Sequence, residues 1–155
     1  MSHTLQETRA VTYHLEIPID APPDVVWRSL TEATNAWWLE DFHMTGPESV
    51  VTLDAEAGGR LIEHSEGGAS LLWYTVQLAV PGASLDLVGH VSAQFGGPAT
   101  TMLRLALEPH DGGTLLRVTD SLVGHVSDDT VKSLESGWTQ LFGEGLKAHA
   151  ERARQ

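Results

Sequence analysis

Three side chains among the apolar runs of this sequence carry groups that can bind a ligand or transfer a proton. His64 and Tyr74 belong to two successive runs, RLIEHSE and SLLWYTVQLAV, and Asp120 shares the alternating positions of Leu116 and Val118. An imidazole, a phenol and a carboxylate can orient a bound molecule through hydrogen bonds, and they can also serve as general acid and base. Either chemistry requires these side chains to converge in one cavity.

Other kinds of site leave no pattern in the sequence. The 155 residues include no cysteine, which excludes disulfides, cysteine zinc sites and thiol nucleophiles, and which suits a reducing cytoplasm. None of the eight histidines stands in a local metal-binding motif, although a pair from different strands, such as His64 with His90, stays open as an alternative. G-x-S-x-G, G-x-G-x-x-G and Walker patterns are absent, so we expect neither a cofactor nor a metal.

The charge of the chain limits its partners. Nine Lys and Arg residues stand against 21 Asp and Glu residues, which gives a net charge of −12. Nucleic acid and anionic membrane surfaces should repel such a protein, because it offers few cations to their phosphates. No apolar run reaches the ~18 residues of a membrane span, and MSHTLQETRA at the N-terminus has no pattern of a secretory signal. We therefore expect a cytoplasmic protein without membrane insertion.

Alternation and glycine-rich breaks predict a sheet of about seven strands. In residues 11–19, VTYHLEIPI, apolar and polar side chains alternate as in a half-buried strand. Six more strand-like runs occur between residues 48 and 123, separated by turn sequences such as Gly58-Gly59 and Gly96-Gly97-Pro98. Because short turns join each run to the next, the strands are expected to form an antiparallel meander.

Helices are expected before and after this meander. Two short helices are predicted in residues 20–30 and 31–42, after the first strand. A long helix is predicted from Asp128 to about Ala150, with Ser127 as its N-cap and a continuous apolar face. At 1.5 Å per residue this helix is about 35 Å long. It is long enough to cross seven strands, which span about 29 Å.

The arrangement of one long helix on a bent sheet predicts a cavity. The concave face of a strongly bent antiparallel sheet must be covered, and a single cylinder contacts some strands while it stands off from others. The remaining space is either filled by large side chains or left as a pocket. The residues expected to line the pocket are Trp38, Leu71, Trp73, Val91, Leu105, Trp138 and Leu141, with His64, Tyr74 and Asp120 as its polar groups.

Two pairs of side chains have predicted directions. Trp37 and Trp38 are adjacent, so their side chains diverge. We expect one ring to seal the short helices against the core and the other to reach the cavity mouth, with ordinary packing of both as the alternative. Arg104 and Arg117 fall opposite the apolar residues of their strands, on the outer face, where they are expected to pair across neighbouring strands.

Six stretches of the sequence resemble a known family and together span nearly the whole chain. They are similar to the domain of the ATPase activator of the 90-kDa heat-shock protein and to its stand-alone bacterial relatives, the AHSA family of the START/Bet v-like, or SRPBCC, superfamily. The stretches are APPDVVW (21–27), AWW (36–38), AGGRL (57–61), YTVQLAVPGASLDL (74–87), GGTLLRVTDS (112–121) and SGWTQLFGEGLKAHAE (136–151).

The resemblance implies the helix-grip fold of the α+β class. A seven-stranded curved antiparallel sheet would wrap around a long C-terminal helix, with two short helices after the first strand. One domain would occupy residues 1–155, with an ordered core over about 9–152. This is the architecture that the strand order and helix length also predict.

The resemblance leaves several functions open. Relatives in the superfamily bind lipids, sterols, plant hormones or polyketides, and others act as cyclases, hydroxylase ligand domains or co-chaperone domains. No catalytic motif is shared by the stand-alone members, so the resemblance implies no catalytic residue. Relatives often carry a histidine followed by a glycine and an aromatic residue at the end of the last strand. In this sequence the corresponding residues, 119–124, are TDSLVG.

Our leading expectation is that the chain binds a small, mostly apolar molecule without catalysis. One alternative is an enzyme of the aromatase, cyclase or hydrolase type that uses His64, Tyr74 or Asp120. Another is a protein-interaction module that acts on a chaperone, which we disfavour because the separate N-terminal domain of the co-chaperone has no counterpart in this sequence. A homodimer formed through the outer sheet face also stays open.

Overall fold

The computed structural model describes residues 1–155, and its elements follow the order predicted from the sequence. Strand β1 (Arg9–Ile19) is followed by helix α1 (Pro23–Glu32), helix α2 (Thr34–Trp37) and the 3₁₀ turn η1 (Glu40–Phe42). The meander then contains β2 (Val50–Leu53), β3 (Arg60–His64), β4 (Ser70–Val80), β5 (Ser84–Val91), the 3₁₀ turn η2 (Ala93–Phe95), β6 (Ala99–His110) and β7 (Gly113–Gly124).

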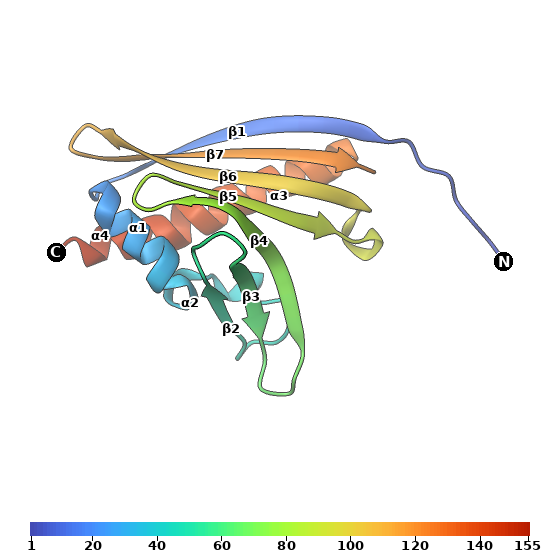
Figure 1. Ribbon diagram of the computed structural model, residues 1–155, viewed down its shortest axis with the longest axis horizontal. Coiled ribbons are helices and arrows are strands. Elements are labelled where there is room, and N and C mark those ends of the chain that lie inside the picture. The colour runs from blue at the N-terminus through green and yellow to red at the C-terminus, as the bar shows by residue number, and fades with distance from the viewer.

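The seven strands form one antiparallel sheet in the order β1-β7-β6-β5-β4-β3-β2. The first strand pairs with the last, which places Tyr13 opposite Asp120. The register shifts between Leu61 and Ile62 in β3 and again between Val76 and Leu78 in β4, and such irregularities bend and twist a sheet. In Figure 1, β2, β3 and β4 turn away from the plane of the other strands, so the sheet is curved. The predicted helix-grip fold is confirmed.

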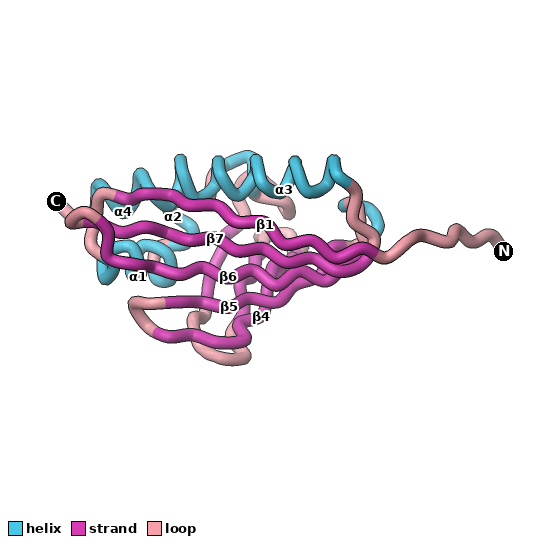
Figure 2. Tube along the Cα trace, turned by 90° about the horizontal axis from the view of Figure 1, so that it is seen from above, coloured by secondary structure: helices cyan, strands magenta, loops and turns pink.

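One long C-terminal helix lies along the sheet (Figure 2). It consists of α3 (Asp128–Gln140), a π-helical segment η3 (Leu141–Leu146) and α4 (Lys147–Ala153). The predicted cap is present, since Ser127 Oγ accepts a hydrogen bond of 3.1 Å from the backbone N–H of Thr130. No helix combines the length and the apolar character that a passage across a membrane requires.

In the π-helical segment, the absence of a side chain at Gly145 lets the long helix approach α2 closely. A Cβ atom at Gly145 would stand 2.4 Å from the carbonyl oxygen of Trp37, which is far inside van der Waals contact. A Cβ atom at Gly143, two residues earlier in the same segment, would meet no atom within 4 Å. Glycine at 145 therefore allows the helix to pack directly on the backbone of the α2 turn.

The outer face of the sheet carries ion pairs between neighbouring strands. Arg104 on β6 lies 2.6 Å from Asp86 on β5. Arg117 on β7 pairs with Glu108 on β6 at 2.9 Å and with Glu16 on β1. Both arginines thus lie on the outer face and pair across strands as predicted, and such exposed pairs contribute little to stability.

Replacement of Gly145 by alanine should destabilise the protein. The new methyl group would collide with a backbone carbonyl, which cannot move without the whole turn, and overpacking of this kind costs about 1–3 kcal/mol. Urea unfolding would measure the loss. The matched control is Gly143→Ala, which should be neutral or stabilising by about 0.5–1 kcal/mol, because alanine is the better helix former and the site is open. Equal effects of the two substitutions would contradict the close approach at Gly145.

Candidate functional site

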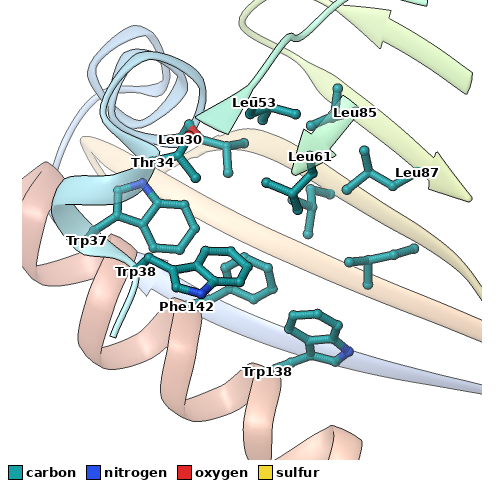
Figure 3. A pocket seen from close by; sticks show the side chains of 12 residues that line it. Leu30, Thr34, Trp37, Trp38, Leu53, Leu61, Leu85, Leu87, Trp138 and Phe142 are labelled. Atoms are coloured by element: carbon teal, nitrogen blue, oxygen red, sulfur yellow. Dashed lines mark hydrogen bonds between the residues drawn. The ribbon is translucent and has the colours of Figure 1, made fainter. Parts of the chain in front are cut away.

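The interior beneath the long helix is filled by aromatic rings. A hollow of about 20 Å³ lies between α2, the strands and η3, and this is room for about one water molecule. Trp37 and Trp38 point into it together with Phe142 (Figure 3). The ring of Trp138 stacks on that of Phe142 with centroids 5.5 Å apart. The helix-on-sheet geometry predicted either a pocket or a filled interior at this position, and the interior is filled.

The two adjacent tryptophans are both buried and diverge within the core. The Trp37 indole donates to the carbonyl of Ser29 at 2.7 Å, and its ring lies 6.1 Å from that of Phe142. The Trp38 indole donates to the carbonyl of Phe42 at 2.9 Å, and its ring lies 5.3 Å from that of Trp73. The backbone at Trp38 is extended, which turns its ring toward the sheet while Trp37 faces the helix. Both rings are therefore packing residues.

A larger hollow lies nearer the surface, between β4, β5 and the helix α3. We call it the β4–α3 groove. Its volume is about 190 Å³, and apolar side chains dominate its walls. Met44, Leu72 and Phe95 form its rim and are each about half exposed. The other lining residues are Leu71, Trp73, Tyr74, His90, Val91, Thr101, Leu134 and Trp138.

A buried carboxylate, Asp120, stands behind one wall of the groove. It is 1% exposed and accepts hydrogen bonds from Tyr13 Oη at 2.6 Å and Thr101 Oγ1 at 2.6 Å. The indole N–H of Trp138 donates to it at 3.2 Å. These donors belong to β1, β6 and α3, so Asp120 joins the sheet to the helix. Alternation along β7 correctly predicted that this side chain faces inward.

The same carboxylate affects two phenols. Burial, the hydrogen bond to Asp120 and the charge of that carboxylate raise the pKa of Tyr13 above its ordinary value. Burial and the charge of Asp120 likewise raise the pKa of Tyr74. Both side chains therefore keep their hydroxyl protons at neutral pH.

A second buried carboxylate, Glu63, stands at the other end of the groove. Glu63 is 0% exposed, and its Oε2 accepts from the Thr45 backbone N–H at 2.7 Å, from Thr45 Oγ1 at 2.9 Å and from Ser49 Oγ at 2.8 Å. Its Oε1 accepts from the Trp73 indole at 3.0 Å. Burial alone raises the pKa of Glu63, but these hydrogen bonds outweigh it and hold the pKa below its ordinary value. The carboxylate fixes Trp73 and the loop that carries Met44.

The structure gathers half of the predicted site residues in the β4–α3 groove. Those that line it are Leu71, Trp73, Tyr74, Val91 and Trp138. Trp38 and Leu105 line the small interior hollow instead. Leu141 is fully buried in the core, and Asp120 lies behind the groove wall.

The predicted direction of His64 is wrong. In β3, Leu61 and Glu63 are buried whereas His64 is exposed, so the imidazole points to solvent on the opposite side of the strand. The side chain that faces inward is its neighbour Glu63, which pattern analysis passes over because a lone carboxylate is costly to bury. The groove residue Thr101 could have been found, since it alternates in step with the buried Leu103 and Leu105. Met44 lies in a loop without any pattern.

The serine–histidine pair next to Glu63 is not arranged for nucleophilic catalysis. His43 Nδ1 lies 2.7 Å from Ser49 Oγ, but Ser49 donates its proton to Glu63 at 2.8 Å. The imidazole must then donate to the serine oxygen, so it cannot accept the serine proton as a base. No group of three His, Asp or Glu side chains is placed to hold a metal ion.

A curved antiparallel sheet that wraps around a long C-terminal helix gives this chain the fold of the helix-grip class of proteins. Within this class the chain belongs to the family described as Activator of Hsp90 ATPase homolog 1-like protein, whose model matches residues 20–151. No curated protein matches the sequence.

Several solved structures share the fold at low sequence identity. An uncharacterised protein from Rhizobium leguminosarum is 20% identical, with a TM-score of 0.71 over 96% of this chain and 99% of that one. The Mll3558 protein from Rhizobium loti is 22% identical, with a TM-score of 0.69 over 92% and 99%. Ara h 8.0201 is 11% identical, with a TM-score of 0.67 over 92% and 98%. These likenesses establish the fold and no activity.

Substitution of Glu63 by glutamine should destabilise the protein by about 2–3 kcal/mol, because a neutral amide weakens charge-assisted hydrogen bonds and turns a donor toward other donors. The matched control is Glu66→Gln, since Glu66 is exposed and should change the free energy of unfolding by less than about 0.5 kcal/mol. Urea unfolding at pH 7 measures both values.

Acid should remove the difference in stability between wild type and Glu63→Gln. The lowered pKa of Glu63 means that its carboxylate stabilises the fold at pH values above about 4.3, the ordinary glutamate value. This contribution is lost as the pH falls through the lowered pKa. Wild type and Glu63→Gln should therefore converge in stability as the pH falls below about 4.3 and through the lowered pKa of Glu63. A gap that stays constant over this range would contradict the role of the ionised carboxylate.

Proposed function

We propose that this protein binds a small, mainly apolar molecule in the β4–α3 groove and catalyses no reaction. The observation that carries the proposal is an apolar hollow of about 190 Å³ whose rim exposes Met44, Leu72 and Phe95 to solvent. Ligand sites are mostly hydrophobic hollows with few polar groups. Half-exposed apolar side chains around a concave surface gain free energy when a ligand covers them.

The volume of the groove restricts the size of the ligand. Sites for drug-sized molecules typically measure about 300–1,000 Å³. Since one water occupies about 30 Å³ in the liquid, about 190 Å³ corresponds to roughly six waters. A molecule with one ring suits this space, whereas sterols and other fused-ring lipids exceed it.

Such a ligand would bind modestly through apolar contact alone. A single aromatic ring that buries about 150 Å² gains about 4 kcal/mol at 25 cal/mol per Å². That free energy corresponds to a dissociation constant of about 1 mM. Polar contacts within the groove would thus have a large share in deciding which molecule binds.

The alternatives receive less support from the geometry. An enzyme that uses His64, Tyr74 and Asp120 is disfavoured, because His64 points away and Asp120 is occupied by donors behind the groove wall. A chaperone partner rests on the family description alone, and a homodimer has no observation in its favour. The cytoplasmic location is likewise proposed from composition.

Replacement of Leu134 by tryptophan should block the groove, because Leu134 lines it from α3 and a bulkier ring would occupy its volume. Ligand-observed NMR with p-xylene, a neutral one-ring hydrocarbon, measures binding. We expect wild type to bind p-xylene and Leu134→Trp to bind it at least about tenfold more weakly. The control Leu78→Trp adds the same ring at an exposed position outside the groove and should bind as wild type does. Failure of wild type to bind, or equal binding by Leu134→Trp, would refute the proposed site.

A further inference from the structure

Three of the five groove-lining side chains that carry a polar atom donate hydrogen bonds to the two buried carboxylates. Thr101 and Trp138 donate to Asp120 at 2.6 Å and 3.2 Å. Trp73 donates to Glu63 at 3.0 Å. These donors face away from the hollow, so they present carbon rather than a free proton to whatever occupies the groove.

The hydroxyl of Tyr74 is the exception in the buried part of this wall. Tyr74 is 5% exposed, and its ring packs beside Gly89, where a Cβ atom would come within 2.9–3.0 Å of two ring carbons. This position directs the phenol from β4 across β5 toward Thr101 on β6. Thr101 is the protein group that forms a hydrogen bond with this hydroxyl, and the proton of Thr101 is itself donated to Asp120. Because Tyr74 also lines the groove, a ligand there can add a second hydrogen bond to its oxygen.

This hydroxyl is a donor and an acceptor in an apolar setting. Because the phenol stays protonated, it can donate one hydrogen bond to a ligand oxygen or accept one from a ligand hydroxyl. A ligand without such a group forgoes this hydrogen bond and leaves the hydroxyl with Thr101 alone.

The negative charge of Asp120, which lies behind the groove wall, disfavours anionic ligands. The Asp120 carboxylate acts on Tyr74 through its charge, and the chain as a whole carries a net charge of −12. Neither arginine nor lysine lines the groove. A carboxylate ligand would thus lose its hydration without gaining a cation.

We propose that the β4–α3 groove selects small neutral one-ring molecules that carry a hydroxyl or carbonyl oxygen, and that Tyr74 Oη recognises this oxygen. The inference rests on the proposed function and names the class of ligand for the same site. Tyr74 is on this account a specificity-determining residue, and Asp120 acts indirectly through it.

Three probes of nearly equal size test the proposal: p-cresol, p-xylene and p-toluate. They differ in one substituent, which is a hydroxyl, a methyl group or a carboxylate. Dissociation constants for each are measured by ligand-observed NMR with wild type, Tyr74→Phe and Tyr13→Phe. The last variant removes a phenol oxygen that also belongs to the Asp120 network but does not line the groove. Circular dichroism and the melting temperature verify that each variant is folded.

We expect wild type to bind p-cresol and p-xylene and to reject p-toluate. The preference for p-cresol over p-xylene, expressed as the ratio of their dissociation constants, should fall about fivefold in Tyr74→Phe, which is the size expected for one neutral hydrogen bond. Tyr13→Phe should keep the wild-type ratio.

The outcomes separate the inference from the function on which it rests. If wild type binds none of the probes, both the proposed function and the inference fail. If it binds p-cresol and p-xylene but the ratio is unchanged in Tyr74→Phe, the groove is a ligand site and recognition by Tyr74 is overturned. Binding of p-toluate as tight as that of p-cresol overturns the selection for neutral molecules.

Discussion

A carboxylate buried without a cation beside it is stable only where several hydrogen-bond donors converge on it, and the groove of this protein depends on two such carboxylates. Asp120 and Glu63 each draw donors from segments that are distant in the sequence. The donors are Tyr13, Thr101 and Trp138 for the former and Thr45, Ser49 and Trp73 for the latter. The two networks fix opposite ends of one surface, and they turn polar side chains outward from the hollow between them. An apolar lining is therefore a consequence of satisfying two buried charges.

Aromatic packing explains why the hollow is small and close to the surface. Trp138 stacks on Phe142 in the core with one face and lines the groove with another part of its ring. Trp38 likewise contacts Trp73 from the interior side, with ring centroids 5.3 Å apart. These rings separate the filled interior from the groove. In this helix-grip domain, the space beneath the helix is thus occupied by the protein's own side chains.

Regular patterns made much of the fold predictable from the sequence. Strict alternation in β7 placed Asp120 inward and Arg117 outward, and the uninterrupted apolar face from Val131 gave the extent of the long helix. Prediction was wrong at His64, because β3 is short and starts after a glycine turn, so only its pairing with β2 and β4 fixes which face each residue occupies.

Other features depend on contacts that no local pattern encodes. The burial of Glu63 is tolerable only because Thr45, Ser49 and Trp73 reach it, and none of them is its neighbour in sequence. The direction of Trp38 depends on the extended backbone that follows α2, and the filling of the interior follows from that direction. The close packing of the π-helical segment was equally unpredictable, since Gly145 matters through its contact with Trp37.

The pairing of β1 with β7 also has a consequence for synthesis of the chain. In the strand order β1 has β7 as its sole neighbour, so β1 finds its place in the sheet only after residue 124 has been synthesised. The bond between Tyr13 and Asp120 spans 107 residues of sequence. Contacts of such long range slow folding, because a large loop must close before they form. Until then β1 stays unpaired in the nascent chain, and unpaired strands are prone to associate with other chains.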